Sequence, residues 1–120
     1  MDTKLFDSER KVMEVLWEAD APLTAREIAL RLGETVGWNK NTTYTVIKKC
    51  IDKGAIQRRE PNFQCLPLVR REEAQTAAAV ELVDKVFDGS ASLLFASLLS
   101  GKQLPPEEVR RLRTLIDELE

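Results

Sequence analysis

Apolar side chains recur at helical spacing near the start of the chain. Val12, Val15 and Leu16 fall on one side of a helix, which the spacing predicts over residues 8–18. Asp7 or Ser8 can cap the N-terminus of this helix, because a short polar side chain accepts a hydrogen bond from the first turn. The pattern then breaks at the Ala-Pro-Leu sequence of residues 21–23.

A second amphipathic stretch follows this break. Thr24 and Glu27 have the spacing of a capping box, in which each side chain bonds the backbone N–H near the other. Ile28 and Leu32 supply the inward face, and Gly33 is predicted to lie just beyond the end of the helix. The spacing therefore predicts a short second helix close behind the first.

A third helix is predicted between Asn39, a favoured N-cap, and Gly54, a favoured C-terminal stop. At 100° per residue its apolar or small side chains share one face, which consists of Thr43, Val46, Ile47 and Cys50. The opposite face carries amide, hydroxyl and ammonium groups. It consists of Asn41, Tyr44, Thr45, Lys48 and Asp52, flanked by Thr42 and Lys49. Such groups can donate to phosphates and to base edges in a major groove.

After Gly54 the pattern changes to the alternation of a β-hairpin. Residues 55–60 and 63–66 read as strands, and Pro61-Asn62 reads as the turn between them. Three helices followed by a hairpin predict a mainly α fold, with a winged helix-turn-helix domain over residues 1–70. In this wing Ile56 and Phe63 would pack inward, while Arg58 or Arg59 would face DNA.

Residues 71–120 contain three further apolar stretches and are predicted to form a three-helix dimerisation domain. A segment of this length forms at best a marginal core, so its apolar stripes need a partner. A second copy of the chain satisfies both stripes, and packing against the winged helix of the same chain is the alternative. The residues predicted to form the dimer are Leu82, Val86, Leu94, Leu98, Val109, Leu112, Ile116 and Leu119.

Charge separates the middle of the chain from its two ends. The net charge is −2, yet residues 38–71 carry 8 Lys or Arg and 2 Asp or Glu. A basic segment in an acidic chain favours a surface that meets phosphate. The alternatives are a merely solvated helix face and a winged helix that binds a protein without DNA. The predicted DNA-binding residues are Asn39, Lys40, Asn41, Thr42, Tyr44, Thr45, Lys48, Lys49, Arg58 and Arg59.

Composition argues against several other classes of protein. The chain has no histidine, and its 2 cysteines, Cys50 and Cys65, suit buried free thiols better than a disulfide or a metal site. No glycine-rich phosphate loop or nucleophile motif is present, so we expect neither an enzyme nor a cofactor. Without a membrane-length apolar run or a signal peptide, the chain is expected in the cytoplasm, with no membrane partner.

These features together carry a family resemblance. The matching positions are residues 12–17 (VMEVLW), 23–25 (LTA), Trp38, Thr42, Thr45, 53–56 (KGAI) and 67–69 (PLV). The chain resembles the penicillinase repressors, the BlaI/MecI group of bacterial transcription regulators, which also includes the copper-responsive CopY proteins. The resemblance covers nearly the whole chain. It implies a homodimeric repressor that binds double-stranded DNA at a palindromic operator.

The resemblance also assigns residues to operator binding. By position, the base-reading and phosphate-binding residues are Asn41, Thr42, Tyr44, Thr45 and Lys49. The better-known members have Lys and Arg where this chain has Asn41 and Tyr44. Both differences remove a positive charge, so a different operator sequence is expected.

The resemblance further implies a signal that inactivates the repressor. In penicillinase repressors a sensor protease system leads to cleavage of an Asn-Phe bond in a short apolar helix, which makes such a system an implied partner. Ala96-Ser97 occupies that bond here. CopY-type proteins instead sense copper through paired Cys-x-Cys motifs near the C-terminus, and this chain has none.

Overall fold

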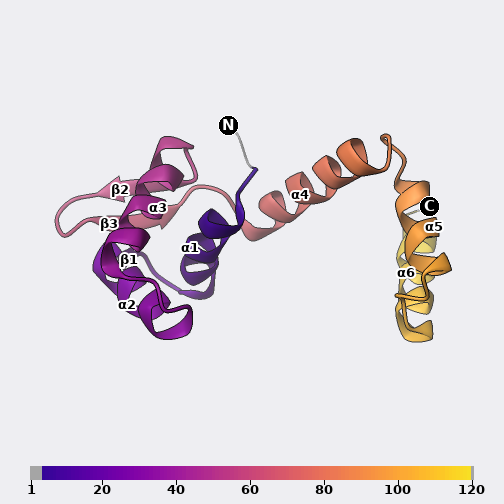
Figure 1. The fold of residues 1–120 in the computed structure, drawn as a ribbon, viewed down its shortest axis with the longest axis horizontal. Coiled ribbons are helices and arrows are strands. Elements are labelled where there is room, and N and C mark those ends of the chain that lie inside the picture. Colours follow the sequence, from indigo (N-terminus) through magenta and orange to yellow (C-terminus); the bar gives the residue numbers. More distant parts are fainter. Residues whose placement is uncertain (1–3, 120) are drawn as a thin grey trace. The chain divides into compact units, whose positions relative to one another are not determined.

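A computed structural model describes residues 4–119. The chain divides into two compact units between Ala79 and Val80, and each unit is described by itself. The elements, labelled in Figure 1, are α1 (Asp7–Glu18), β1 (Leu23–Thr24), α2 (Ala25–Thr35), α3 (Lys40–Asp52), β2 (Ile56–Arg59), β3 (Gln64–Pro67), α4 (Arg71–Val86), α5 (Ala91–Ser100) and α6 (Pro106–Glu118). The predicted mainly α fold with a winged helix-turn-helix unit is confirmed.

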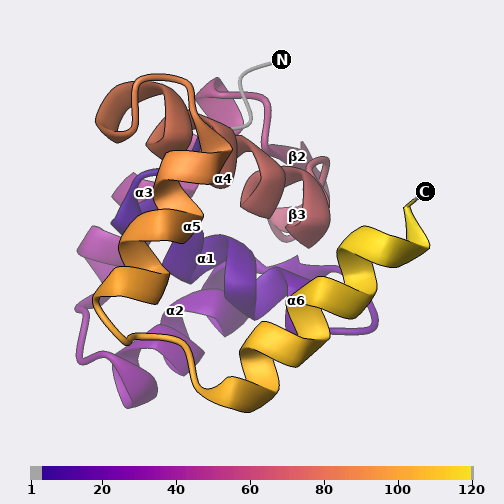
Figure 2. The same ribbon diagram turned by 90° about the vertical axis from the view of Figure 1, so that its right-hand side faces the viewer.

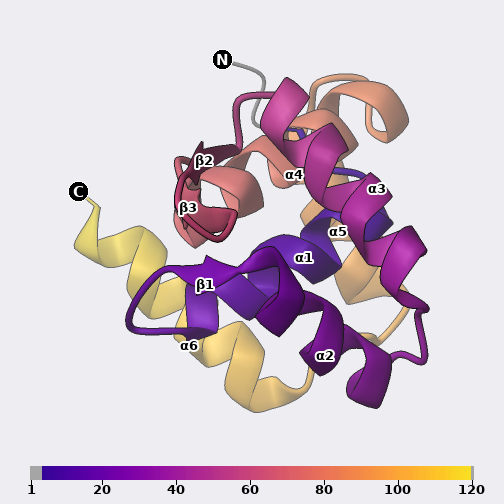
Figure 3. The same cartoon turned by 90° about the vertical axis from the view of Figure 1, so that its left-hand side faces the viewer.

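The first unit packs three helices against a small antiparallel sheet (Figure 3). The strand order is β1-β3-β2, so β3 lies in the centre and pairs with both neighbours. In the register of these pairs, Cys65 of β3 lies opposite Leu23 of β1 and Arg58 of β2. The hairpin was predicted, whereas β1 was not, because a strand of 2 residues shows no alternation of its own.

The inward faces predicted for the three helices form one hydrophobic core. This core also takes in Ala55 and Ile56 from the start of the wing, Cys65 from β3, and Val69 beyond it. Side chains from all three helices are almost completely shielded from solvent, and these are Val12, Met13, Leu16, Ala25, Ile28, Leu32, Val46, Ile47 and Cys50. The predicted inward positions are therefore buried except for Val15, which is half-buried, while Met13 and Ala25 are buried without having been predicted.

Two helix ends differ from their predictions. The N-cap of α1 is Phe6 rather than Asp7 or Ser8, because the Glu9 carboxylate accepts a 2.8 Å hydrogen bond from the Phe6 N–H. The second helix does not end at Gly33. It continues to Thr35, and Gly37, at φ 81°, takes the left-handed conformation in which its N–H bonds the carbonyl of Leu32.

Both predicted ends of α3 are confirmed. Asn39 is the N-cap, and its side-chain oxygen accepts a 2.8 Å hydrogen bond from the Thr42 N–H. Gly54 follows the C-cap residue at φ 83°, a conformation that glycine adopts without a steric penalty. The capping box of α2 is also present, with the Glu27 N–H donating to Thr24.

The beginning of α4 is anchored to the winged-helix unit. The Trp17 indole N–H donates a 2.8 Å hydrogen bond to the Val69 carbonyl, and the Arg71 guanidinium lies 5.7 Å from the Trp17 ring centre. Val69 is 1% exposed, and Ala74 packs against the core from the first turns of the helix. The division between the units falls later in α4, whereas the sequence pattern placed it at residue 70.

The second unit contains the end of α4, then α5 and α6, which a short turn joins (Figure 2). Positive φ angles at Asp88 and Gly89 mark the turn before α5. None of the described residues from 80 to 119 is buried. Among the helices in the described part of the chain, none has the length and hydrophobicity needed to cross a membrane.

Candidate nucleic-acid interface

Helix α3 presents one packed face and one open face. Thr43, Val46, Ile47 and Cys50 are all buried, as its helical periodicity predicts. Most of the opposite side is exposed, and its exposed members are Lys40, Asn41, Thr42, Thr45, Lys48, Lys49 and Asp52. The helix therefore holds its polar groups in fixed positions above a rigid core, which suits reading a groove.

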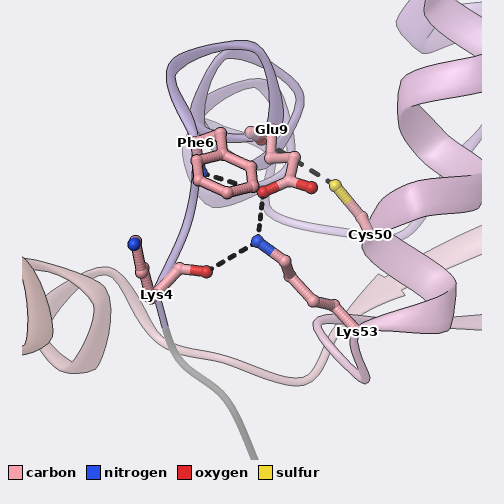
Figure 4. Close-up of polar contacts among 5 residues, drawn as sticks. All are labelled: Lys4, Phe6, Glu9, Cys50 and Lys53. Carbon is pink, nitrogen blue, oxygen red and sulfur yellow. Dashed lines mark hydrogen bonds and ion pairs between the residues drawn. The ribbon is translucent and has the colours of Figure 1, made fainter.

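An ion pair at the C-terminal end of α3 fixes this helix against α1. The Lys53 ammonium binds the Glu9 carboxylate and donates a 2.8 Å hydrogen bond to the Lys4 carbonyl (Figure 4). The two side chains are 17% and 3% exposed, and the ammonium also lies 4.3 Å from the centre of the Phe6 ring. Lys53 belongs to the basic segment of the sequence, but in the structure its ammonium is paired with the buried Glu9 and is not free at the surface.

The two cysteines are free thiols in the core, as predicted. The Cys50 thiol contacts the Glu9 carbonyl at 3.9 Å (Figure 4). Burial raises the pKa of Cys50 to about 12 and that of Cys65 to about 11. Both thiols therefore stay protonated and unreactive at neutral pH. Within residues 4–119 no three Cys, Asp or Glu side chains are grouped to hold a metal.

The hydroxyl and amide groups of the open face are partly committed to the helix itself. Thr45 Oγ1 donates a 2.9 Å hydrogen bond to the Asn41 carbonyl one turn earlier. Its oxygen can still accept a hydrogen bond, and its methyl group can contact a thymine methyl. Lys48 and Lys49 are exposed and form no ion pair with any of the described residues.

The wing places two arginines in different surroundings. The Arg58 guanidinium carbon lies 3.6 Å from the centre of the Phe63 ring, and its Nε binds the Glu60 carboxylate. The hydrogen bond from Arg58 lowers the pKa of Glu60, which is therefore ionised at neutral pH. Arg59 is exposed and has no acidic partner among residues 4–119.

Tyr44 brings the helix and the wing together. Its ring meets the Phe63 ring edge to face, with centres 5.9 Å apart, and Lys40 lies 5.5 Å from the centre of the Tyr44 ring. The predicted DNA-binding residues of α3 and of the wing thus lie next to each other at this contact. No local sequence signal indicates the contact between Tyr44 and Phe63, because the two residues belong to different elements.

The predicted dimerisation residues differ in exposure. Leu82, Val86, Ile116 and Leu119 are exposed, whereas Leu94, Leu98, Val109 and Leu112 are half-buried. Five further large apolar side chains of the second unit are exposed and were absent from the predicted dimerisation residues, namely Val80, Leu93, Phe95, Leu99 and Leu115. Ala96 and Ser97 are exposed on α5, within its helical hydrogen-bonding pattern.

Three helices, a small antiparallel sheet and an exposed third helix define a winged helix-turn-helix protein. A model of one family of such proteins matches residues 5–118, and the chain therefore belongs to the penicillinase repressor family. Members of this family are repressors rather than enzymes, so the resemblance and the expected absence of enzymatic activity are confirmed.

Individual relatives agree with this assignment. The penicillinase repressor of Bacillus licheniformis is 22% identical over 117 residues, which cover 96% of this chain and 91% of that protein. The methicillin resistance regulatory protein MecI of Staphylococcus aureus strain N315 is 24% identical, with 98% and 99% coverage. The solution structure of the DNA binding domain of the repressor BlaI matches at 25% identity and a TM-score of 0.54. The matched region covers 59% of this chain and 88% of the BlaI domain.

Proposed function

We propose that this repressor is a homodimer that binds a palindromic DNA operator, with α3 in the major groove and the wing on the flanking backbone. The observation that carries the proposal is the division of α3 into a buried apolar face and an exposed face of lysine, hydroxyl and amide groups. Membership of the penicillinase repressor family supports it, as does the likeness to the DNA binding domain of BlaI.

Charge and geometry suggest how the predicted residues divide the work. Lys40, Lys48 and Lys49 carry positive charge on the open face of α3, and Arg58 and Arg59 carry it on the wing. These charges suit phosphate contacts. Asn41, Thr42 and Thr45 are exposed on α3 and suit contacts to base edges. The side chain of Asn39 is occupied in capping the helix, so this residue would act mainly by holding the first turn.

The second unit supports the proposed dimer. Its exposed apolar side chains include Ile116 and Leu119 on α6, which are 57% and 87% exposed. A second copy of the chain can cover these groups with the same groups of its own, which is the rule for a two-fold interface. A dimer also brings two winged-helix domains together, so that each can bind one half-site of a palindromic operator.

Salt-dependent binding to duplex DNA tests the proposal. Fluorescence anisotropy with a labelled duplex of mixed sequence, measured from low to physiological salt, should show a steep linear fall of log affinity with log salt, because bound lysines and arginines release counterions. A pool of random duplexes should then yield a palindromic preferred site. If no duplex binds even at low salt, the alternative of a protein-interaction module replaces the proposal.

Replacing Thr45 with alanine should reduce sequence discrimination by about 1–3 kcal/mol, because this change removes one groove contact. Binding to the selected operator and to random DNA gives this difference directly. Thr45→Val is the matched control, since it keeps the γ-methyl group and replaces the hydroxyl with a second methyl. Equal losses on operator and random DNA would remove Thr45 from the base-reading set.

Replacing Arg59 with alanine should weaken binding to every sequence and lower the slope of log affinity against log salt by about 0.9, the value for one lost phosphate contact. The anisotropy titration supplies both quantities. Arg10→Ala removes the same charge from the surface of α1 and should leave the slope unchanged. An unaltered slope for Arg59→Ala would show that this arginine does not touch phosphate.

A further inference from the structure

Four side chains form a continuous stack from the first turn of α3 to the wing. Lys40 lies 5.5 Å from the centre of the Tyr44 ring, and the Tyr44 ring meets Phe63 at 5.9 Å with an angle of 88° between their planes. The Arg58 guanidinium carbon lies 3.6 Å from the centre of the Phe63 ring. These are favourable edge-to-face and cation–π arrangements, so each side chain restricts its neighbour.

The position of Phe63 is held by its backbone as well as by its ring. Its carbonyl accepts a 3.0 Å hydrogen bond from the Ala25 N–H at the start of α2, and its own N–H donates to Glu60. Its φ of 52° lies in the left-handed region, which is strained for a bulky side chain. Such a conformation persists only where the surroundings determine it, and here the Tyr44 and Arg58 contacts are part of those surroundings.

The strand register determines which face of the wing carries Arg58. Arg58 lies opposite Cys65 in the β2–β3 register, and directly opposed residues point to the same face of a sheet. Cys65 is fully buried, so Arg58 belongs to the face that packs toward the helices. Arg59 alternates to the other face. Only Arg58 is therefore placed where the wing meets the open face of α3.

Tyr44 is half-buried, and its ring is in edge-to-face contact with Phe63. A side chain that reads a base must be able to turn its polar group toward the base edges in the groove. The ring of Tyr44 is instead held in an intramolecular contact. We propose that Tyr44 is a positioning residue for operator binding: through Phe63 it holds Arg58 at the junction of α3 and the wing, where Arg58 binds a backbone phosphate. This inference rests on the proposed DNA-binding function and assigns the role of one position within it.

Substitutions that keep or remove the ring test the inference. Tyr44→Phe retains the stack and should match the original protein in affinity, in salt slope and in the sequence selected from random duplexes. Tyr44→Leu removes the aromatic contact and should weaken binding to all sequences, with a salt slope lower by about 0.9, as for one lost phosphate. Arg58→Ala should give the same lowered slope.

A double substitution separates positioning from general loss of structure. In the Arg58→Ala background, Tyr44→Leu should cause no further fall in affinity or slope, because both changes act through the same phosphate contact. Additive losses would overturn the inference. A Tyr44→Phe protein that prefers a different base at one operator position would also overturn it, since the hydroxyl would then be a reader. Failure of the unsubstituted protein to bind any duplex would instead refute the proposed DNA-binding function.

Discussion

Replacing Lys53 with methionine is expected to lower the free energy of unfolding of the winged-helix unit by about 3–5 kcal/mol, because a buried carboxylate loses its counterion. Glu9 is 2% exposed, and its carboxylate binds both the Lys53 ammonium and the Phe6 N–H. Methionine fills similar space without charge, so the loss would come from electrostatics rather than from a cavity. Urea unfolding followed by far-ultraviolet circular dichroism measures the change.

Two further proteins show whether the lost ion pair causes this effect. Glu9→Gln/Lys53→Met removes both charges while leaving an acceptor for the Phe6 N–H, and it should recover most of the stability. Lys48→Met changes an exposed lysine of the same helix and should alter stability by less than about 0.5 kcal/mol. A loss for Lys53→Met no larger than that for Lys48→Met would mean that water reaches Glu9 and replaces the ammonium.

Replacing Ile116 with aspartate should convert the proposed dimer into monomers of 13.6 kDa. Ile116 is 57% exposed within one chain, so the substitution spares the fold of that chain and acts on the contact with a second copy. The two-fold axis repeats the change, and burying two isoleucine side chains contributes about 3–6 kcal/mol. Leu112, by contrast, is half-buried, so an aspartate there would also disturb its own unit.

Sedimentation equilibrium measures the mass of the Ile116→Asp protein, and anisotropy measures its affinity for the selected operator. A monomer contacts only one half-site of the operator, so operator binding should weaken by at least about a hundredfold. The weak binding of each winged helix to random DNA should remain. Thr114→Asp introduces the same charge on the opposite side of α6 and should remain dimeric. A dimeric Ile116→Asp protein would locate the interface elsewhere in the second unit.

The basic segment of the middle of the chain is not a single surface. Its lysines differ in role, since Lys48 and Lys49 are open to solvent while Lys53 is held in an ion pair with Glu9. Its arginines differ as well, since Arg58 is stacked on Phe63 and Arg59 is exposed. Counting charge along the sequence therefore overstates how many of these groups are free to meet a phosphate.

The local sequence pattern was enough to predict the three helices and the hairpin of the winged-helix unit. Val46, Ile47 and Cys50 are buried together because the period of a regular helix, about 3.6 residues per turn, brings them to the same side. Asn39 and Gly54 end α3 for reasons that lie within a few residues of each end. Helix-by-helix patterns, capping residues and the turn at Pro61-Asn62 therefore sufficed to predict a winged helix.

Contacts between distant residues could not be predicted in this way. The strand β1 exists because Leu23 and Thr24 pair with β3, and the ion pair joins Glu9 to Lys53 across 44 positions of the chain. The position of Tyr44 over Phe63 likewise depends on how the wing folds back on α3. Residue periodicity indicates which side of an element faces inward, but it does not indicate which residues of other elements pack against that side. For this repressor, sequence was therefore sufficient to predict which face of α3 is buried and which is exposed, and only packing showed which of the polar and aromatic side chains are held in internal contacts.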